Sequence, residues 1–190
     1  MNILLIGSGG REHALAWKMT QSHHCDALFI APGNPGTAAL GTNVAIDIND
    51  FEALRKFAVD QSIDMVVVGP EEPLVKGIFD FFAQHESTAD INVIGPSKNA
   101  AQLEGSKAFS KHFMQRHGIP TASYAEFTLE NYEEGKKYIS AHPLPIVLKA
   151  DGLAAGKGVI IAFNHQEALV SFEEMIQHKQ FGAASSKVVI

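Results

Sequence analysis

The sequence predicts an α/β protein in two parts: a doubly wound domain with a parallel sheet, then a smaller unit of mixed strands and helices. Three observations support this. Apolar runs of strand length alternate with segments of helical spacing over residues 1–96. Glycine and proline clusters follow several of those runs, as turns require. Further along, the apolar runs at 146–149 and 159–162 follow one another with only a glycine-rich loop between them.

The first part opens with a β-α-β unit. Apolar residues predict a strand at 2–6, Gly7-Ser8-Gly9-Gly10 forms a turn, a helix follows at about 11–20, and a strand lies at 27–31. The later elements are a strand near 43–46, a helix after Asn49 or Asp50, a strand at 65–68, a helix with Leu74, Ile78, Phe81 and Phe82 on its apolar face, and a strand at 92–94. Repeated units of this length predict a parallel sheet with helices on both faces.

The second part begins around Ser97 and Ser106, both candidate helix caps, and a helix that ends before Gly118. The elements expected after it are a strand at 122–127, a helix at about 130–140, strands at 146–149 and 159–162, a helix at about 166–177, and the start of a strand at 188–190. We expect the domains to span residues 1–105 and 106–190.

Composition and charge exclude several classes of protein. The 190 residues are 46% hydrophobic and 19% charged, which is typical of a globular chain with a real core. A net charge of −6 argues against a nucleic-acid-binding protein. No apolar run approaches the roughly 20 residues of a membrane span. Cys25 is the only cysteine, so we expect a reducing compartment, the cytoplasm.

The stretch from Pro145 to Val159, PIVLKADGLAAGKGV, carries the strongest chemical signal. An apolar strand would end at Lys149, and the glycines around Lys157 would let backbone N–H groups approach an anion. The spacing does not fit a Walker A motif, because Gly158 stands where that motif has Ser or Thr. Phosphate binding and an ordinary glycine-rich hairpin both remain open from the loop alone.

The first glycine loop resembles a dinucleotide fingerprint, but the match fails. The third glycine of that fingerprint falls on Glu12, and no acidic residue follows the second strand to hold a ribose. A smaller phosphate fits better, since Gly9 and Gly10 open a helix and Arg11 could add a bidentate contact. The alternative is a tight turn with Arg11 solvated.

Polar residues in two other turns, and a lysine at a helix start, are further candidates. Asn34 and Glu71 follow the second and fourth strands, at the sheet edge where open α/β domains bind ligands. Glu71 could instead cap a helix. Lys107 lies near the positive end of a helix, an unfavourable place for a lysine unless an anion is close. The nine histidines show no metal-ligand spacing.

Taken together, five segments resemble the phosphoribosylamine–glycine ligase family of the ATP-grasp superfamily. They are GSGGREHALAWK, PGNPGT, VVVGPEEPLVKGIFD, AAQLEGSKAFSKHFM and VLKADGLAAGKGV, and they cover nearly the whole chain in order. The resemblance implies a pre-ATP-grasp domain followed by the small α+β lid subdomain of an ATP-grasp fold. It also implies an enzyme of purine biosynthesis that joins glycine to 5-phosphoribosylamine with ATP, through glycyl phosphate.

The same resemblance implies roles for individual residues. Lys107 and Lys149 would contact ATP phosphates, and Gly156, Lys157 and Gly158 would form a loop over the triphosphate. The substrate side would carry Gly9, Gly10, Arg11, Asn34 and Glu71.

Members of this family are longer than this chain, and their Mg²⁺ or Mn²⁺ ligands are expected in the part that follows it. We therefore expect an amino-terminal fragment, inactive alone, with small-molecule partners, no nucleic acid and no membrane. The sequence gives no oligomeric state. Two alternatives stay open: another ATP-grasp carboxylate–amine ligase, and a non-catalytic nucleotide-binding module.

Overall fold

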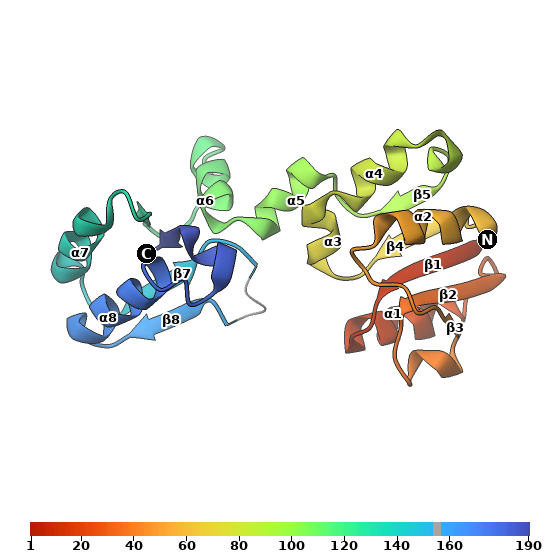
Figure 1. The fold of residues 1–190 in the computed structure, drawn as a ribbon, viewed down its shortest axis with the longest axis horizontal. Helices are drawn as coiled ribbons and strands as arrows, with labels where there is room; N and C mark the ends of the chain where they lie inside the picture. The colour runs from red at the N-terminus through yellow and green to blue at the C-terminus, as the bar shows by residue number, and fades with distance from the viewer. Residues whose placement is uncertain (154–156) are drawn as a thin grey trace. The chain divides into compact units, whose positions relative to one another are not determined.

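The computed structural model describes residues 1–153 and 157–190 of the chain (Figure 1). The chain divides into two compact units, Met1–Ala101 and Gln102–Ile190. Among the helices of the described residues, none is both long and apolar enough to cross a membrane.

The first unit is built on a five-stranded sheet in the order β3-β2-β1-β4-β5, and every neighbouring pair is parallel. Its strands are β1 (Asn2–Gly7), β2 (Ala27–Pro32), β3 (Thr42–Asn43), β4 (Met65–Val68) and β5 (Asn92–Ile94). From the central β1 the chain adds strands first on one side and then on the other. This order confirms the predicted doubly wound domain.

Helices cover both faces of this sheet. They are α1 (Gly10–Met19), α2 (Phe51–Asp60), α3 (Glu71–Lys76) and α4 (Ile78–Gln84), with short 3-10 turns at Thr37–Ala39 and Glu86–Thr88. Leu4 and Ile6 of β1 pack in a cluster with residues of α2 and α4, whereas Ile3 and Leu5 pack in a cluster with Ala16 of α1. Because side chains alternate along a strand, an unbroken apolar run satisfies both faces.

Two elements of the first unit differ from the prediction. The strand expected at 43–46 is only Thr42–Asn43. The single helix expected through Leu74 and Phe82 is two helices, α3 and α4, separated at Gly77, whose φ is +99°. Glycine adopts this left-handed conformation without strain, and it ends α3 as a C-cap.

Two helices follow β5: α5 (Lys98–Gly105) and α6 (Lys107–Arg116). Ser106 caps α6, because its Oγ accepts the N–H of Phe109 at 3.0 Å. The predicted cap is thus confirmed at the position that separates the two helices.

The second unit is built on a four-stranded sheet in the order β6-β9-β7-β8, with every pair antiparallel. Its elements are β6 (Glu126–Phe127), α7 (Tyr132–Ala141), β7 (Ile146–Ala150), β8 (Val159–Ala162), α8 (His165–Ile176), a 3-10 turn (Gly182–Ser186) and β9 (Val188–Val189). The two helices and one sheet face enclose a core that includes Ile146, Leu148 and Phe172. This α+β unit confirms the second part of the predicted fold.

The strand expected at 122–127 is wrong in length, since β6 begins only at Glu126. Ala125 still exchanges backbone hydrogen bonds with Ile190. Ahead of it, however, the Ala122 carbonyl accepts the Lys111 ammonium at 2.8 Å. A side chain therefore satisfies this stretch of backbone where a strand partner would otherwise do so.

Candidate functional site

The predicted substrate residues of the first unit lie in loops that follow β1, β2 and β4. Gly9 is the N-cap of α1 and Gly10 is its first residue, so the first backbone N–H groups of the helix lie at this turn. Asn34 follows β2, and Glu71 is the first residue of α3, after β4. The three strands are neighbours and parallel, so their carboxyl ends meet at one sheet edge.

A residue that the sequence analysis did not choose, Glu12, holds this edge together. Its side chain is buried, with 4% of the residue exposed. Its carboxylate accepts the N–H of Gly9 at 2.7 Å and the Nε–H of Arg11 at 2.9 Å. A Cβ at Gly7 or Gly69 would collide with the Glu12 side chain. Gly7 at the end of β1 and Gly69 directly after β4 therefore make room for a carboxylate.

The signal for Glu12 was present in the sequence. A glutamate three residues after an N-cap can bond back to the N-cap N–H, as in a capping box. The dinucleotide fingerprint has a glycine at this position, where this chain has the carboxylate of Glu12.

Arg11 is brought next to Glu71, as the predicted site requires. The Arg11 side chain is 60% exposed, and its guanidinium lies 3.7 Å from Glu71 Oε2. The hydrogen bond that Arg11 donates to Glu12 raises the pKa of Arg11, and the negative charges of Glu12 and Glu71 act in the same direction. The result is an exposed cation, oriented by two carboxylates, beside the N-terminus of α1.

The Asn34 side chain forms hydrogen bonds with backbone groups of this region. Its Nδ2 donates to the Ser8 carbonyl at 2.9 Å, which ties the loop after β2 to the loop after β1. Its Oδ1 accepts the N–H groups of Gly36 and Thr37 at 2.7 and 3.0 Å. The side chain thus builds the turn, as asparagine commonly does.

In the second unit, Lys149 lies on β7 between buried neighbours. Leu148 and Ala150 are buried, while Lys149 alternates to the other face of the sheet. Among the described residues, the Lys149 ammonium takes part in no ion pair. Its charge is therefore available to an anion.

The positive charge of Lys149 acts on the pKa values of Lys107 and Lys111, which both lie on α6. The Lys107 Nζ donates to the carbonyl of Gly152 at 3.1 Å. Burial lowers the pKa of Lys107; Asp151 opposes this shift, and repulsion from Lys149 adds to it. Burial and Lys149 likewise lower the pKa of Lys111. The structure thus gathers three cations, of which sequence reasoning chose Lys107 and Lys149.

The end of the glycine-rich loop is fixed to β7. Gly158 is buried, and its carbonyl accepts the N–H of Ala150 at 2.8 Å. Lys157 is exposed. Gly156, also predicted to contact phosphate, lies outside the described residues.

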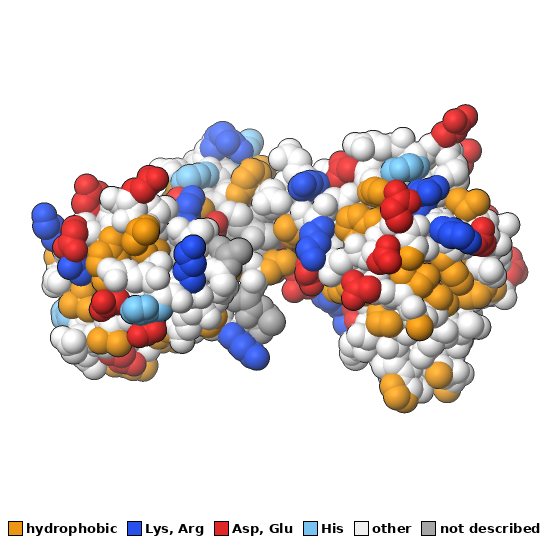
Figure 2. Space-filling model, viewed as in Figure 1, with side chains coloured by type: hydrophobic (Ala, Val, Ile, Leu, Met, Phe, Trp, Pro, Cys, Tyr) orange, Lys and Arg blue, Asp and Glu red, His pale blue; other side chains and the backbone are white. Residues whose placement is uncertain are grey.

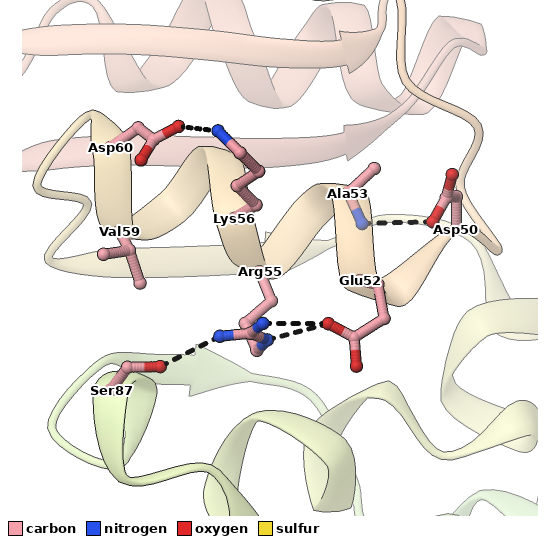
Figure 3. Close-up of a pocket in the computed structure, with 8 residues that line it drawn as sticks. All are labelled: Asp50, Glu52, Ala53, Arg55, Lys56, Val59, Asp60 and Ser87. Atoms are coloured by element: carbon pink, nitrogen blue, oxygen red, sulfur yellow. Dashed lines mark hydrogen bonds and ion pairs between the residues drawn. The ribbon is translucent and has the colours of Figure 1, made fainter.

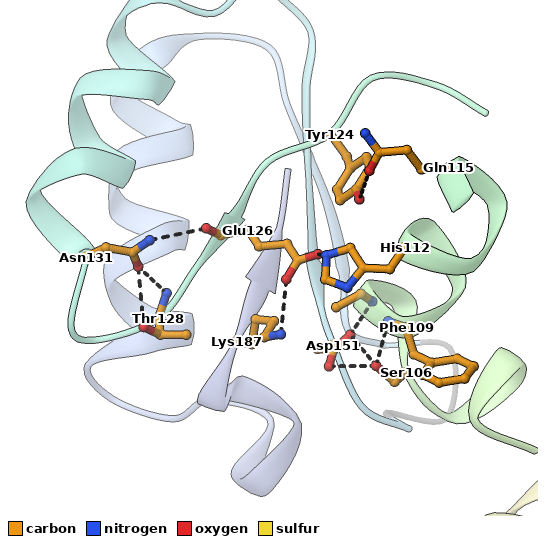
Figure 4. Close-up of polar contacts among 11 residues, drawn as sticks. Ser106, Phe109, His112, Gln115, Tyr124, Glu126, Thr128, Asn131, Asp151 and Lys187 are labelled. Atoms are coloured by element: carbon orange, nitrogen blue, oxygen red, sulfur yellow. Dashed lines mark hydrogen bonds and ion pairs between the residues drawn. The ribbon is translucent and has the colours of Figure 1, made fainter. Parts of the chain in front are cut away.

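A second cluster of charges, also missed by sequence reasoning, surrounds Glu126 of β6 (Figure 4). The Glu126 side chain is 17% exposed and lies 2.7 Å from His112 Nε2 and 3.0 Å from Lys187 Nζ. These contacts join α6, β6 and the residue before β9. The Glu126 carboxylate is thus paired within the cluster, which stabilises the packing of α6 on this sheet.

A surface hollow on α2, with a volume of about 420 Å³, is a poor candidate for a binding site (Figure 3). Its charged groups already pair with one another, Arg55 with Glu52 and Lys56 with Asp60, and Arg55 also donates a hydrogen bond to the Ser87 hydroxyl. In the face shown in Figure 2, acidic and basic side chains are interspersed over both units. Across residues 1–153 and 157–190, no group of three or more His, Cys, Asp or Glu could hold a metal ion.

Comparison with known families agrees with this arrangement. The family model for the phosphoribosylglycinamide synthetase N domain matches residues 1–104, and the model for its ATP-grasp (A) domain matches residues 105–190. The chain is 53% identical to the phosphoribosylamine–glycine ligase of Haemophilus influenzae and 51% identical to that of Vibrio cholerae. Each alignment covers 100% of this chain and 43% of the relative.

A solved structure shows the same fold. The crystal structure of phosphoribosylamine–glycine ligase from Thermotoga maritima superposes with a TM-score of 0.75 at 31% sequence identity. The match covers 100% of this chain and 43% of that one. The chain thus spans less than half the length of the relatives it matches.

Proposed function

Because this chain belongs to the phosphoribosylglycinamide synthetase family, we propose that it serves the ATP-dependent ligation of glycine to 5-phosphoribosylamine. The glycine carboxylate takes the γ-phosphoryl group of ATP, and ADP leaves. The nitrogen of 5-phosphoribosylamine then attacks the acyl carbon of glycyl phosphate, losing a proton as inorganic phosphate departs. The observation that best supports this proposal is the pair of lysines, Lys107 and Lys149, which lie beside a glycine-rich loop.

Lys107 and Lys149 serve the nucleotide side of the reaction. Both are cations on a chain of net charge −6, and neither is neutralised by a carboxylate in direct contact among the described residues. Lys157 and Gly158, with Gly156, complete the phosphate-binding side. Charge neutralisation of the transferred phosphoryl group requires no nucleophilic side chain.

Gly9, Gly10 and Arg11 serve the phosphate-bearing substrate of the first unit. The N–H groups at the start of α1 and the exposed guanidinium of Arg11 are the groups that bind phosphate. Glu71 orients Arg11 and presents a carboxylate to hydroxyls or an amine. Asn34 holds the turn that borders this edge.

The proposal includes a divalent cation, Mg²⁺ or Mn²⁺, which neutralises phosphate charge when ATP binds. The residues described here hold no ligand cluster for it, so we assign its ligands to the part of the relatives that this chain does not span. Inactivity of the 190-residue chain alone, a boundary at residues 105 and 106, and a cytoplasmic location remain predictions.

The experiment measures ADP release by the full-length protein with ATP, magnesium, glycine and 5-phosphoribosylamine. We expect ADP release to require glycine, and Lys149→Ala to weaken ATP binding about tenfold, as loss of a charged contact of about 1.5 kcal/mol predicts. The control, Lys56→Ala, removes a surface lysine paired with Asp60 and should leave binding unchanged. ADP release that does not respond to glycine would instead indicate another carboxylate substrate.

A further inference from the structure

We propose that Asp151 is a positioning residue for the nucleotide: it ties the first turn of α6 to the end of β7, and so holds Lys107 and Lys149 in one arrangement. This inference rests on the proposed function, because it concerns the ATP-phosphate side of that site. Asp151 lies two residues after Lys149 and immediately after β7.

The Asp151 carboxylate caps a helix that is distant in sequence. Its Oδ1 accepts the N–H of Ala108 at 2.7 Å, and both oxygens are within 3.2 Å of the Ser106 hydroxyl (Figure 4). Ser106 already caps α6 through the N–H of Phe109. The first turn of α6 therefore has a local cap and a second one that lies 43 positions further along the chain.

The Asp151 backbone makes the same connection from the other side. Its carbonyl accepts the N–H of Lys107 at 3.2 Å, and the next carbonyl, that of Gly152, accepts the Lys107 ammonium at 3.1 Å. Its own N–H donates to the carbonyls of Ala184 and Lys187, each at 3.0 Å. One residue thus fixes α6, the end of β7 and the segment before β9 to each other.

Gly152 packs closely against Ala184 at this junction. A Cβ at Gly152 would lie 3.0 Å from the Cβ of Ala184 and 3.1 Å from its Cα, tighter than ordinary packing. Rotation of Lys107 about the junction would break the hydrogen bonds above. The Lys107 ammonium is therefore held at the end of β7 by backbone carbonyls of the chain itself.

Charge gives Asp151 a second effect on the same lysine. Lys149 repels the Lys107 ammonium, whereas Asp151 and Glu104 stabilise it. Burial lowers the pKa of Lys107, and removing the Asp151 charge would lower it further. An Asp151 that only capped a helix would affect folding stability without moving the pH dependence of nucleotide binding.

The test compares Asp151→Ala and Asp151→Asn in the full-length protein, with MgATP affinity measured by calorimetry across pH. We expect Asp151→Ala to weaken MgATP binding about tenfold, the effect of one charged contact, with the KM for glycine unchanged. Asp151→Asn keeps the shape and removes the charge, so its affinity should be lost at a lower pH than in the wild type. If Asp151→Ala does not fold, Asp151→Asn still tests the positioning role.

Two further variants separate the outcomes. Asn164→Ala removes the N-cap of α8, whose Oδ1 accepts the N–H of Glu167 at 2.8 Å in the same unit, and should leave MgATP affinity unchanged. Wild-type affinity and pH dependence in both Asp151 variants, with weakened binding in Lys149→Ala, would overturn the positioning role alone. If Lys149→Ala also binds MgATP normally, the assigned nucleotide site is wrong.

Discussion

Replacing Glu12 with alanine should destabilise the first unit far more than an ordinary surface substitution does. The change removes a buried carboxylate that accepts the N–H of Gly9 at 2.7 Å and the Nε–H of Arg11 at 2.9 Å. Both Gly7 and Gly69 pack so closely on this side chain that a Cβ at either glycine would collide with it. The loss therefore leaves a void together with two unmade bonds.

The magnitude follows from these contacts. The charged bond to the Gly9 N–H contributes about 1.5 kcal/mol, and the buried methylene adds about 0.8 kcal/mol. The ion pair contributes about 0.5 kcal/mol, because Arg11 is 60% exposed. Removing a buried charge offsets part of this sum, so we expect a loss of about 2 kcal/mol in the free energy of unfolding. The total free energy of unfolding of a domain of this size is about 5–15 kcal/mol.

Urea denaturation followed by tryptophan fluorescence measures the effect directly. Trp17 is the only tryptophan and lies on α1, the helix that contains Glu12, so the signal reports on the first unit. A loss of about 2 kcal/mol should lower the midpoint by about 1 M urea. Glu12→Gln keeps an acceptor for Gly9 and should lose less than half as much.

The matched control is Glu52→Ala, which removes an exposed glutamate that pairs with Arg55 on α2. Its side chain is 63% exposed, so the change in the free energy of unfolding should stay within about 0.5 kcal/mol. If Glu12→Ala shifts the midpoint no more than Glu52→Ala does, the structural role argued for the buried carboxylate is refuted.

Two other predictions concern the second unit. Gly135→Ala on α7 places a methyl group 2.5 Å from Cζ of the fully buried Phe172; overpacking of about 1–3 kcal/mol outweighs the gain of about 1 kcal/mol in helix propensity. Hydrogen exchange should quicken in α7 and α8, and unchanged protection would contradict the packing. The pKa of Lys107 is lowered chiefly by burial, and bound phosphate should raise it again. MgATP binding by the full-length protein should therefore take up protons at alkaline pH. Calorimetry in buffers of different ionisation enthalpy measures this proton uptake, which should be absent in Lys107→Ala.

Much of the fold could be predicted because its signals are local. The run Ile3–Ile6 is apolar at every position and short, which is typical of a strand buried on both faces, and the structure places it at the centre of the parallel sheet. Ser106 was identified as a cap from residue type alone. The break at Gly77 was missed because leucine and phenylalanine keep helical spacing across it.

Candidate site residues could be proposed from the sequence where the chemistry follows from a single segment. Lys149 stands at the end of an alternating strand, and Arg11 stands at the start of a helix after a glycine turn; both assignments rest on short stretches. Asn34 was predicted from its place after a strand. Its side chain is engaged by the N–H groups of Gly36 and Thr37, and only the folded turn shows these hydrogen bonds.

By itself, then, the sequence determined the alternation of elements, the two glycine loops and the lysines beside them, because periodicity and turn chemistry act over a few residues. Only the tertiary structure decided that Glu12 is buried between Gly7 and Gly69, and that Asp151 joins α6 to β7 across 43 positions. The physical reason is that burial and long-range hydrogen bonds depend on which loops the sheets bring together. The oriented Arg11 and the tethered Lys107 are products of that assembly.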